Sequence, residues 1–108
     1  MLAARTADEK LGRATLMIDV SRAVGITDYF VITNGGNYRQ VDAIVDAIEE
    51  AISKVGGPKP YRIEGKEERA WVLMDYIDFV VHVFDPEARE YYELERLWKD
   101  EPQVEWRE

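Results

Sequence analysis

The segment 37–58 places the strongest constraint on the fold, because it predicts one long helix with a single apolar face. Its large apolar side chains recur at three- and four-residue spacing, which gathers them on one side of an α-helix. Asn37 and Gln40 have the spacing of a capping box, and Gly56-Gly57-Pro58 ends the helix. Such a helix needs a sheet or a second helix to cover its apolar face, which is made of Val41, Ile44, Val45, Ile48, Ile52 and Val55.

Segments with the alternating or continuous apolar character of β-strands precede and follow this helix in the sequence. Thr15 to Val20 and Asp28 to Thr33 precede it, and Ala70 to Met74 and Phe79 to Phe84 follow it. A more polar connection, residues 61–65, is a further strand-like segment. This order predicts an α/β fold with a single compact domain, in which a mixed β-sheet is packed by helices.

A last helix follows the strands. Asp85 is a suitable N-cap and Pro86 fits the first helical position. The chain of 108 residues is long enough for one core and too short for two domains. We therefore expect a short polar segment over residues 1–14, one domain over 15–100, and a frayed tail over 101–108. The last helix carries Tyr91, Leu94, Leu97 and Trp98.

The charge balance favours a basic partner over nucleic acid. Twenty-two acidic and 14 basic residues give a formal net charge of −8, which repels a phosphate backbone. No segment has the roughly 20 consecutive apolar residues of a membrane span, and the start lacks the features of a signal peptide. Cysteine is absent, so thiolate ligands and disulfides are excluded. These features predict a cytoplasmic protein that does not bind membranes.

The acid and aromatic segment 71–84 is the candidate functional surface. A tight turn centred on Tyr76 and Ile77 would place Asp75 opposite Asp78 and sort the side chains between two faces. One face is then wholly apolar. Two like charges opposite each other cost stability unless a basic partner benefits from them. The other face combines aromatic, aliphatic, acidic and imidazole groups, namely Trp71, Leu73, Asp75, Asp78, Val80, His82 and Phe84.

A structural interpretation of the same residues stays open beside the functional one. Aspartates are common in turns because their side chains accept backbone hydrogen bonds. Trp71 can cover the edge of a core, and His82 can be a hydrogen-bonded packing residue. On the residues alone, the interface and the packing interpretations are equally supported.

Enzymatic interpretations lack essential groups. The turn at Gly35-Gly36 precedes a helix but has neither of the phosphate-binding glycine motifs. Asp75 and Asp78 with Asp19 or Asp28 would make an incomplete set for a metal ion, and the single histidine has no nucleophile to activate. We therefore expect no enzyme, no metal and no cofactor. A residual nucleotide-binding or nucleotidyltransferase-like protein remains the alternative.

Several motifs in sequence order resemble the Iojap family, the bacterial ribosomal silencing factor S. The resemblance covers roughly residues 15–98, and its most specific part is the block from Trp71 to Phe84. The other matching motifs are Asp19-Val20-Ser21, Thr27-Asp28-Tyr29-Phe30-Val31-Ile32, Arg39-Gln40-Val41, Glu64-Gly65 and Arg89-Glu90-Tyr91-Tyr92-Glu93-Leu94-Glu95-Arg96-Leu97-Trp98.

The resemblance implies a nucleotidyltransferase-like topology without the catalytic motif, and a repressor of translation. It further implies binding to large-subunit ribosomal protein fourteen, a basic protein of the 50S subunit, so that the small subunit cannot join. A homodimer is possible, but one that uses the same face is disfavoured, because aspartates would meet across the two-fold axis. The implied contact residues are Trp71, Leu73, Asp75, Tyr76, Asp78, Val80 and His82, with Glu64, Glu95 and Trp98 as secondary contacts.

Overall fold

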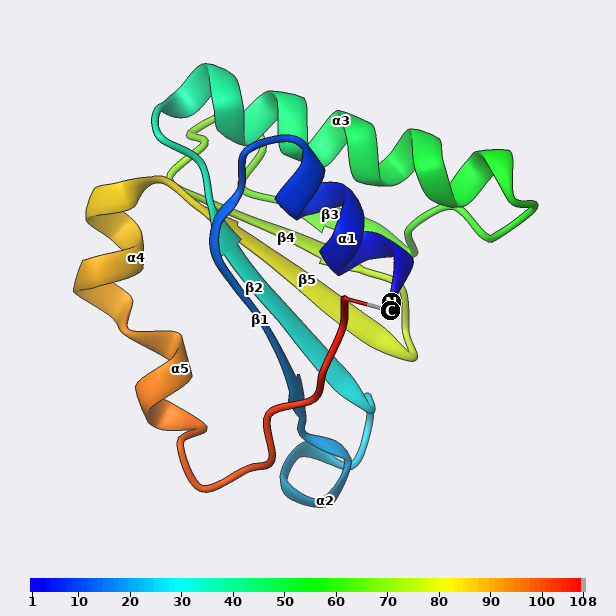
Figure 1. Cartoon of the computed structure of the whole chain (residues 1–108), viewed down its shortest axis with the longest axis vertical. Helices are drawn as coiled ribbons and strands as arrows, with labels where there is room; N and C mark the ends of the chain where they lie inside the picture. The colour runs from blue at the N-terminus through cyan, green and yellow to red at the C-terminus, as the bar shows by residue number, and fades with distance from the viewer. Residues whose placement is uncertain (108) are drawn as a thin grey trace.

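A five-stranded mixed sheet forms the centre of the computed structural model, which describes residues 1–107 (Figure 1). The strand order is β1-β2-β5-β4-β3. Strands β2 and β5 are parallel, whereas the other neighbouring pairs are antiparallel. The predicted mixed sheet is therefore confirmed. The strands are β1 (Arg13–Asp19), β2 (Tyr29–Asn34), β3 (Arg62–Glu64), β4 (Trp71–Asp75) and β5 (Phe79–Phe84).

The sheet separates two hydrophobic cores, and helices cover both of its faces. Helices α1 (Leu2–Glu9) and α3 (Tyr38–Lys54) lie on one face, and α4 (Pro86–Tyr92) and α5 (Leu94–Leu97) lie beside the other (Figure 1). Alternate residues of each strand enter the two cores, because successive side chains of a strand point to opposite faces. In β5, for example, Val81 and Val83 enter the first core, and Phe84 enters the second.

The long helix begins and ends where the sequence predicts. The Asn37 carboxamide oxygen accepts a hydrogen bond from the Gln40 backbone N–H at 3.0 Å, which satisfies one free amide of the first turn. The Gln40 side chain accepts in turn from the Gly36 N–H at 3.0 Å. The predicted apolar face is buried up to Ile52, but Val55 lies beyond the last turn and is 72% exposed. Val55 is thus no part of the core.

The two ends of the chain differ from the expectation of a minor first segment and a frayed tail. Three alanines of α1 are fully buried, and their small side chains let α1 approach α3 closely. The carbonyl of Met17 accepts from the Val104 N–H at 2.8 Å, so the C-terminal segment lies along β1. Trp106 is buried, and its Nε1–H donates to the Thr15 carbonyl at 3.0 Å. Both ends therefore belong to the folded domain.

The predicted last helix is interrupted. Its N-cap is as expected, since Asp85 Oδ1 accepts from the Ala88 N–H at 2.7 Å and Pro86 occupies the first turn. Glu93 has a left-handed backbone with φ +44°, which ends α4 and redirects the chain into α5. A further short helix, α2 (Ser21–Val24), was not predicted and connects β1 to β2.

The C-terminal segment gives a direct test of the packing. Trp106→Ala removes a buried indole and its hydrogen bond, so we expect a loss of about 3 to 5 kcal/mol in the free energy of unfolding. Urea unfolding followed by circular dichroism measures this loss. Val55→Ala is the control, because an exposed side chain should change stability by less than about 0.5 kcal/mol. Equal stability of the two variants would contradict a structural role for Trp106.

Candidate functional site

The hairpin formed by β4 and β5 differs in register from the expectation. Asp75 pairs with Val80, and the Tyr76 N–H donates to the Phe79 carbonyl at 2.9 Å, so the turn is centred on Ile77 and Asp78. This register is two residues away from the predicted one. A shift of two leaves every side chain on its predicted face. It also separates Asp75 from Asp78, so the predicted opposition of two like charges is wrong.

The two aspartates have different environments. Asp75 is half-buried and serves the turn, since its Oδ1 accepts from the Ile77 N–H at 2.8 Å. Its other oxygen lies 3.5 Å from Arg62 Nε, and Arg62 also pairs with Glu64 at 3.2 Å. Asp78 lies exposed at the tip of the hairpin, where its carboxylate has no ion pair with any residue of the described chain. The Asp78 carboxylate is therefore available to pair with a basic group of another molecule.

Trp71 and His82 form a packed pair across β4 and β5. Trp71 Nε1–H donates to His82 Nδ1 at 3.1 Å, although Leu73 is the residue directly opposite His82. The indole stacks on Phe84 at 5.0 Å between ring centroids. His82 contacts Phe30 edge to face at 4.6 Å. Both residues are thus fixed by the second core while Trp71 keeps part of its surface exposed.

The protonation of His82 follows from this environment. Burial disfavours the charged ring and lowers the pKa of His82 from 6.5 to about 4. The ring is therefore neutral near pH 7. Since Nδ1 accepts the hydrogen bond from Trp71, the proton of the neutral ring lies on Nε2. This Nε2–H is buried and has no hydrogen-bond partner within residues 1–107.

Two of the predicted contact residues, Tyr76 and Glu95, have partners other than Trp71 and His82 within the chain. Tyr76 is buried on the opposite face, where it stacks on Phe79 at 4.9 Å. Burial, together with the charge of Glu49, raises the pKa of Tyr76 to about 12. Glu95 pairs with the buried Arg89 at 2.9 Å. Tyr76 therefore lies on the face opposite Trp71 and His82, whereas the contact role of Glu95 stays a prediction.

The remaining predicted residues share one face. Trp98 lies at its margin, where its ring meets Phe30 edge to face at 5.6 Å. Glu64 is exposed on the outer strand β3. The paired strands bring Trp71, Leu73, Asp75, Val80 and His82 together, and Asp78 follows at the tip of their turn. These six residues are called the hairpin face below.

A hollow of about 280 Å³ opens within the hairpin face. Its floor is formed by strands β2, β4 and β5, and the connection from α2 to β2 forms a wall. Most residues of this wall were not predicted, because a loop packed against distant strands leaves no periodic signal in the sequence. The lining residues are Val24, Ile26, Thr27, Phe30, Tyr61, Arg62, Leu73, Asp75, Ile77, Val80 and His82.

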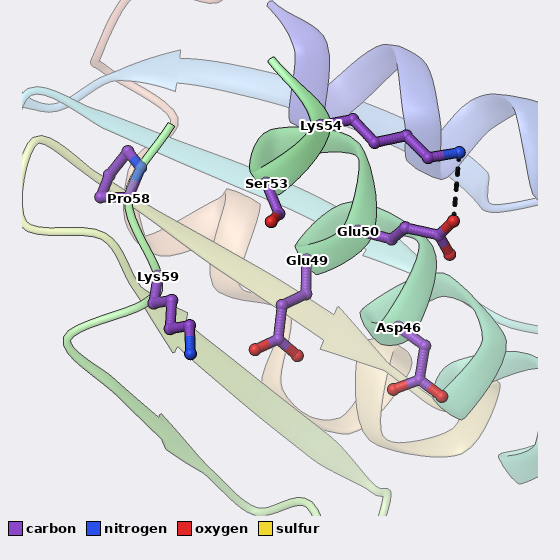
Figure 2. Close-up of a pocket in the computed structure, with 7 residues that line it drawn as sticks. All are labelled: Asp46, Glu49, Glu50, Ser53, Lys54, Pro58 and Lys59. Atoms are coloured by element: carbon purple, nitrogen blue, oxygen red, sulfur yellow. Dashed lines mark ion pairs between the residues drawn. The ribbon is translucent and has the colours of Figure 1, made fainter. Parts of the chain in front are cut away.

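A larger hollow of about 400 Å³ lies on α3 and has a different character (Figure 2). Figure 2 shows the carboxylates of Asp46, Glu49 and Glu50 on the helix and Lys59 on the following loop. Glu50 already pairs with Lys54 at 3.2 Å. Within residues 1–107, no group of three or more acidic or histidine side chains is placed to hold a metal ion. This hollow is a solvated charged surface.

The family of the chain follows from comparison with known proteins. The family model described as "Ribosomal silencing factor during starvation" matches residues 1–108. The chain belongs to this ribosomal silencing factor family. The predicted family is thereby confirmed, and its name associates the chain with the ribosome and with regulation of translation. In the described part of the chain, no helix has the length and apolar character needed to cross a membrane.

Individual relatives of the ribosomal silencing factor family agree in sequence and fold. A Bacillus subtilis protein named ribosomal silencing factor RsfS is 39% identical over 94% of this chain and 85% of its own. A crystal structure from Bacillus halodurans superposes with a TM-score of 0.83 at 35% identity, covering 97% of this chain and 94% of the other. A mouse protein named mitochondrial assembly of ribosomal large subunit protein 1 is 38% identical over 80% of this chain and 39% of its own.

The single histidine makes the effect of its burial measurable. Below pH 6.5 the unfolded chain takes up a proton at His82, whereas the folded chain does so only near pH 4. The free energy of unfolding should therefore fall as the pH falls through this window, by about 3 kcal/mol in total. Urea unfolding at a series of pH values measures the slope.

His82→Gln should flatten this slope between pH 6.5 and 5, whatever its effect on absolute stability. Carboxylates contribute to the slope below about pH 5 in both proteins, so the comparison is made above that value. The same slope in the variant and in the natural chain would show that His82 titrates normally.

Proposed function

We propose that this protein binds the large ribosomal subunit through the hairpin face and thereby represses translation. The partner is large-subunit ribosomal protein fourteen, a basic protein, and the bound factor blocks the small subunit sterically. The protein acts by binding and performs no catalysis. It works in the cytoplasm, where bacterial ribosomes assemble.

The observation that carries this proposal is the combination of groups that the fold leaves uncovered on the hairpin face. Trp71 supplies an aromatic anchor, and the hollow beside it has an apolar floor. Asp78 offers an unpaired carboxylate at the tip of the hairpin. An apolar centre with charged groups at its rim is typical of protein interfaces, and the acidic rim suits a basic partner.

The names of relatives support the large ribosomal subunit as the partner. The Bacillus subtilis relative is named as a ribosomal silencing factor, and the mouse relative is named for assembly of the large ribosomal subunit. Both names concern ribosomes, and the second specifies the large subunit. Large-subunit binding is the property that would unite them.

Several groups that the nucleotide-binding alternative needs are already bonded within the chain, and Asp75 is one of them. The Gly36 N–H, which would face a phosphate, donates to Gln40. The Asp19 carboxylate accepts from the hydroxyl and the N–H of Ser21, and these bonds lower the pKa of Asp19. These bonds weigh against nucleotide binding.

Charge reversal at the tip of the hairpin tests the acidic contact. Asp78→Lys should weaken binding to purified large subunits by at least about tenfold, because it replaces attraction to a basic partner by repulsion. Co-sedimentation at two salt concentrations measures the affinity and its screening. Asp8→Lys is the matched control, since it makes the same charge change at an exposed position of α1. Equal binding by Asp78→Lys and Asp8→Lys would remove Asp78 from the interface.

Arg62 gives a prediction in the opposite direction. Its guanidinium pairs with Asp75 and thus competes with any basic group of the partner. Arg62→Gln should therefore tighten binding to large subunits by about threefold at low salt, since exposed ion pairs contribute roughly 0.2 to 1 kcal/mol. The same co-sedimentation measurement applies. Weaker binding of Arg62→Gln would mean that the arginine itself contacts the partner.

A further inference from the structure

Two polar groups that line the hollow of the hairpin face have no partner. His82 Nε2 and Thr27 Oγ1 are buried and make no hydrogen bond within residues 1–107. His82 is 4% exposed and Thr27 is 6% exposed. A buried polar group without a partner is costly, and most such groups in folded proteins are satisfied. Because both residues line the hollow, a bound molecule could satisfy both atoms after a small shift of the lining side chains that uncovers them.

The chemistry of His82 determines what can pair with it. Trp71 Nε1–H occupies Nδ1, and the pKa of about 4 keeps the ring neutral near pH 7. Nε2 is then a donor and needs an acceptor oxygen. A lysine or arginine side chain has only donors, so it cannot pair with this atom. The Thr27 hydroxyl both donates and accepts, and can therefore pair with either side of a peptide group.

The charge around the hollow excludes an anionic acceptor. Asp75 lines the hollow, and the whole chain carries a net charge of −8. A carboxylate or a phosphate would be repelled by both. Arg62, the one cation that lines the hollow, is already paired with Asp75 and with Glu64. The acceptor that fits is therefore a neutral oxygen, such as a backbone carbonyl.

The rest of the lining suits an aliphatic side chain. Val24, Phe30, Leu73 and Val80 present apolar surface to the hollow. Its volume of about 280 Å³ exceeds the about 150 Å³ of an apolar cavity that holds benzene. At the rim, three large apolar side chains are exposed, which marks an interaction surface. These are Ile26 at 84%, Tyr61 at 73% and Ile77 at 56% exposure.

We infer that the hollow receives a peptide segment of the ribosomal protein, which packs an aliphatic side chain against Phe30 and Val80. A backbone carbonyl of that segment accepts from His82 Nε2–H, and the Thr27 hydroxyl pairs with the same stretch of backbone. This inference rests on the proposed function and adds the chemistry of the contact. Asp78 attracts the basic partner, whereas the hollow recognises neutral groups.

The experiment uses the full chain and purified large subunits, with the dissociation constant measured by co-sedimentation. Thr27→Val removes the hydroxyl at nearly constant volume, and its hydroxyl makes no bond in the free protein, so the fold should be retained. We expect binding about tenfold weaker, as for loss of one buried hydrogen bond. Thr27→Ser keeps the hydroxyl and should bind within about threefold of the natural chain. Thermal unfolding verifies that each variant is folded.

Two further variants complete the test. His82→Phe keeps a ring in place but removes both the Nε2–H donor and the acceptor of the Trp71 N–H, so it should weaken binding by about tenfold or more. Thr6→Val is the matched control, because Thr6 is a buried threonine of α1 in the part of the chain away from the hairpin face. Its affinity should equal that of the natural chain.

The outcomes separate this inference from the proposed function. If Thr27→Val and His82→Phe bind as tightly as the natural chain while Asp78→Lys does not, the hollow is not part of the interface and the inference is overturned. The proposed function would then stand on the charged contact. If the natural chain itself does not bind large subunits, the proposed function fails, and the inference fails with it.

Discussion

The backbone pairing of β5 is the constraint on which the rest of the structure depends. This strand is hydrogen-bonded to parallel β2 on one side and to antiparallel β4 on the other, and both of its faces are covered. Its alternation sends Val81 and Val83 toward α3 and turns His82 toward the hairpin face. The imidazole is therefore held in the middle of the sheet by the same strand that completes both cores.

The hydrogen bond from Trp71 on β4 to His82 on β5 determines which groups of the hairpin face stay available to a partner. It fixes the tautomer of a neutral ring, so that one nitrogen is used within the chain and the other is left as a donor. A charged histidine here would add a buried cation beside Phe30, which burial disfavours. The hairpin face thus combines a neutral, partly apolar centre with one free carboxylate at its tip.

The spacing of large apolar residues in the sequence predicted the long helix and the strands. The same spacing predicted the buried face of α3 and the face on which each hairpin side chain lies. The hairpin faces were predicted correctly although the predicted register was wrong by two residues, because a shift of two keeps each side chain on its face. The first helix was underestimated because Ala3, Ala4 and Ala7 pack by being small, which a search for large apolar residues does not detect. Thr27 could not be predicted as a site residue, since its place beside His82 depends on a loop folding over distant strands.

The segment that follows α5 also covers part of the edge strand β1, which could otherwise pair with a strand of another chain. Strand β1 would otherwise offer a row of free backbone groups, the usual template for edge-to-edge aggregation. Gln103 and Val104 occupy part of that row through their contacts with Ile18 and Met17. The opposite edge is β3, which has only three residues and carries the charged side chains of Arg62 and Glu64. Both edges are thereby protected, and a sheet of mostly apolar strands can stay dispersed at high concentration.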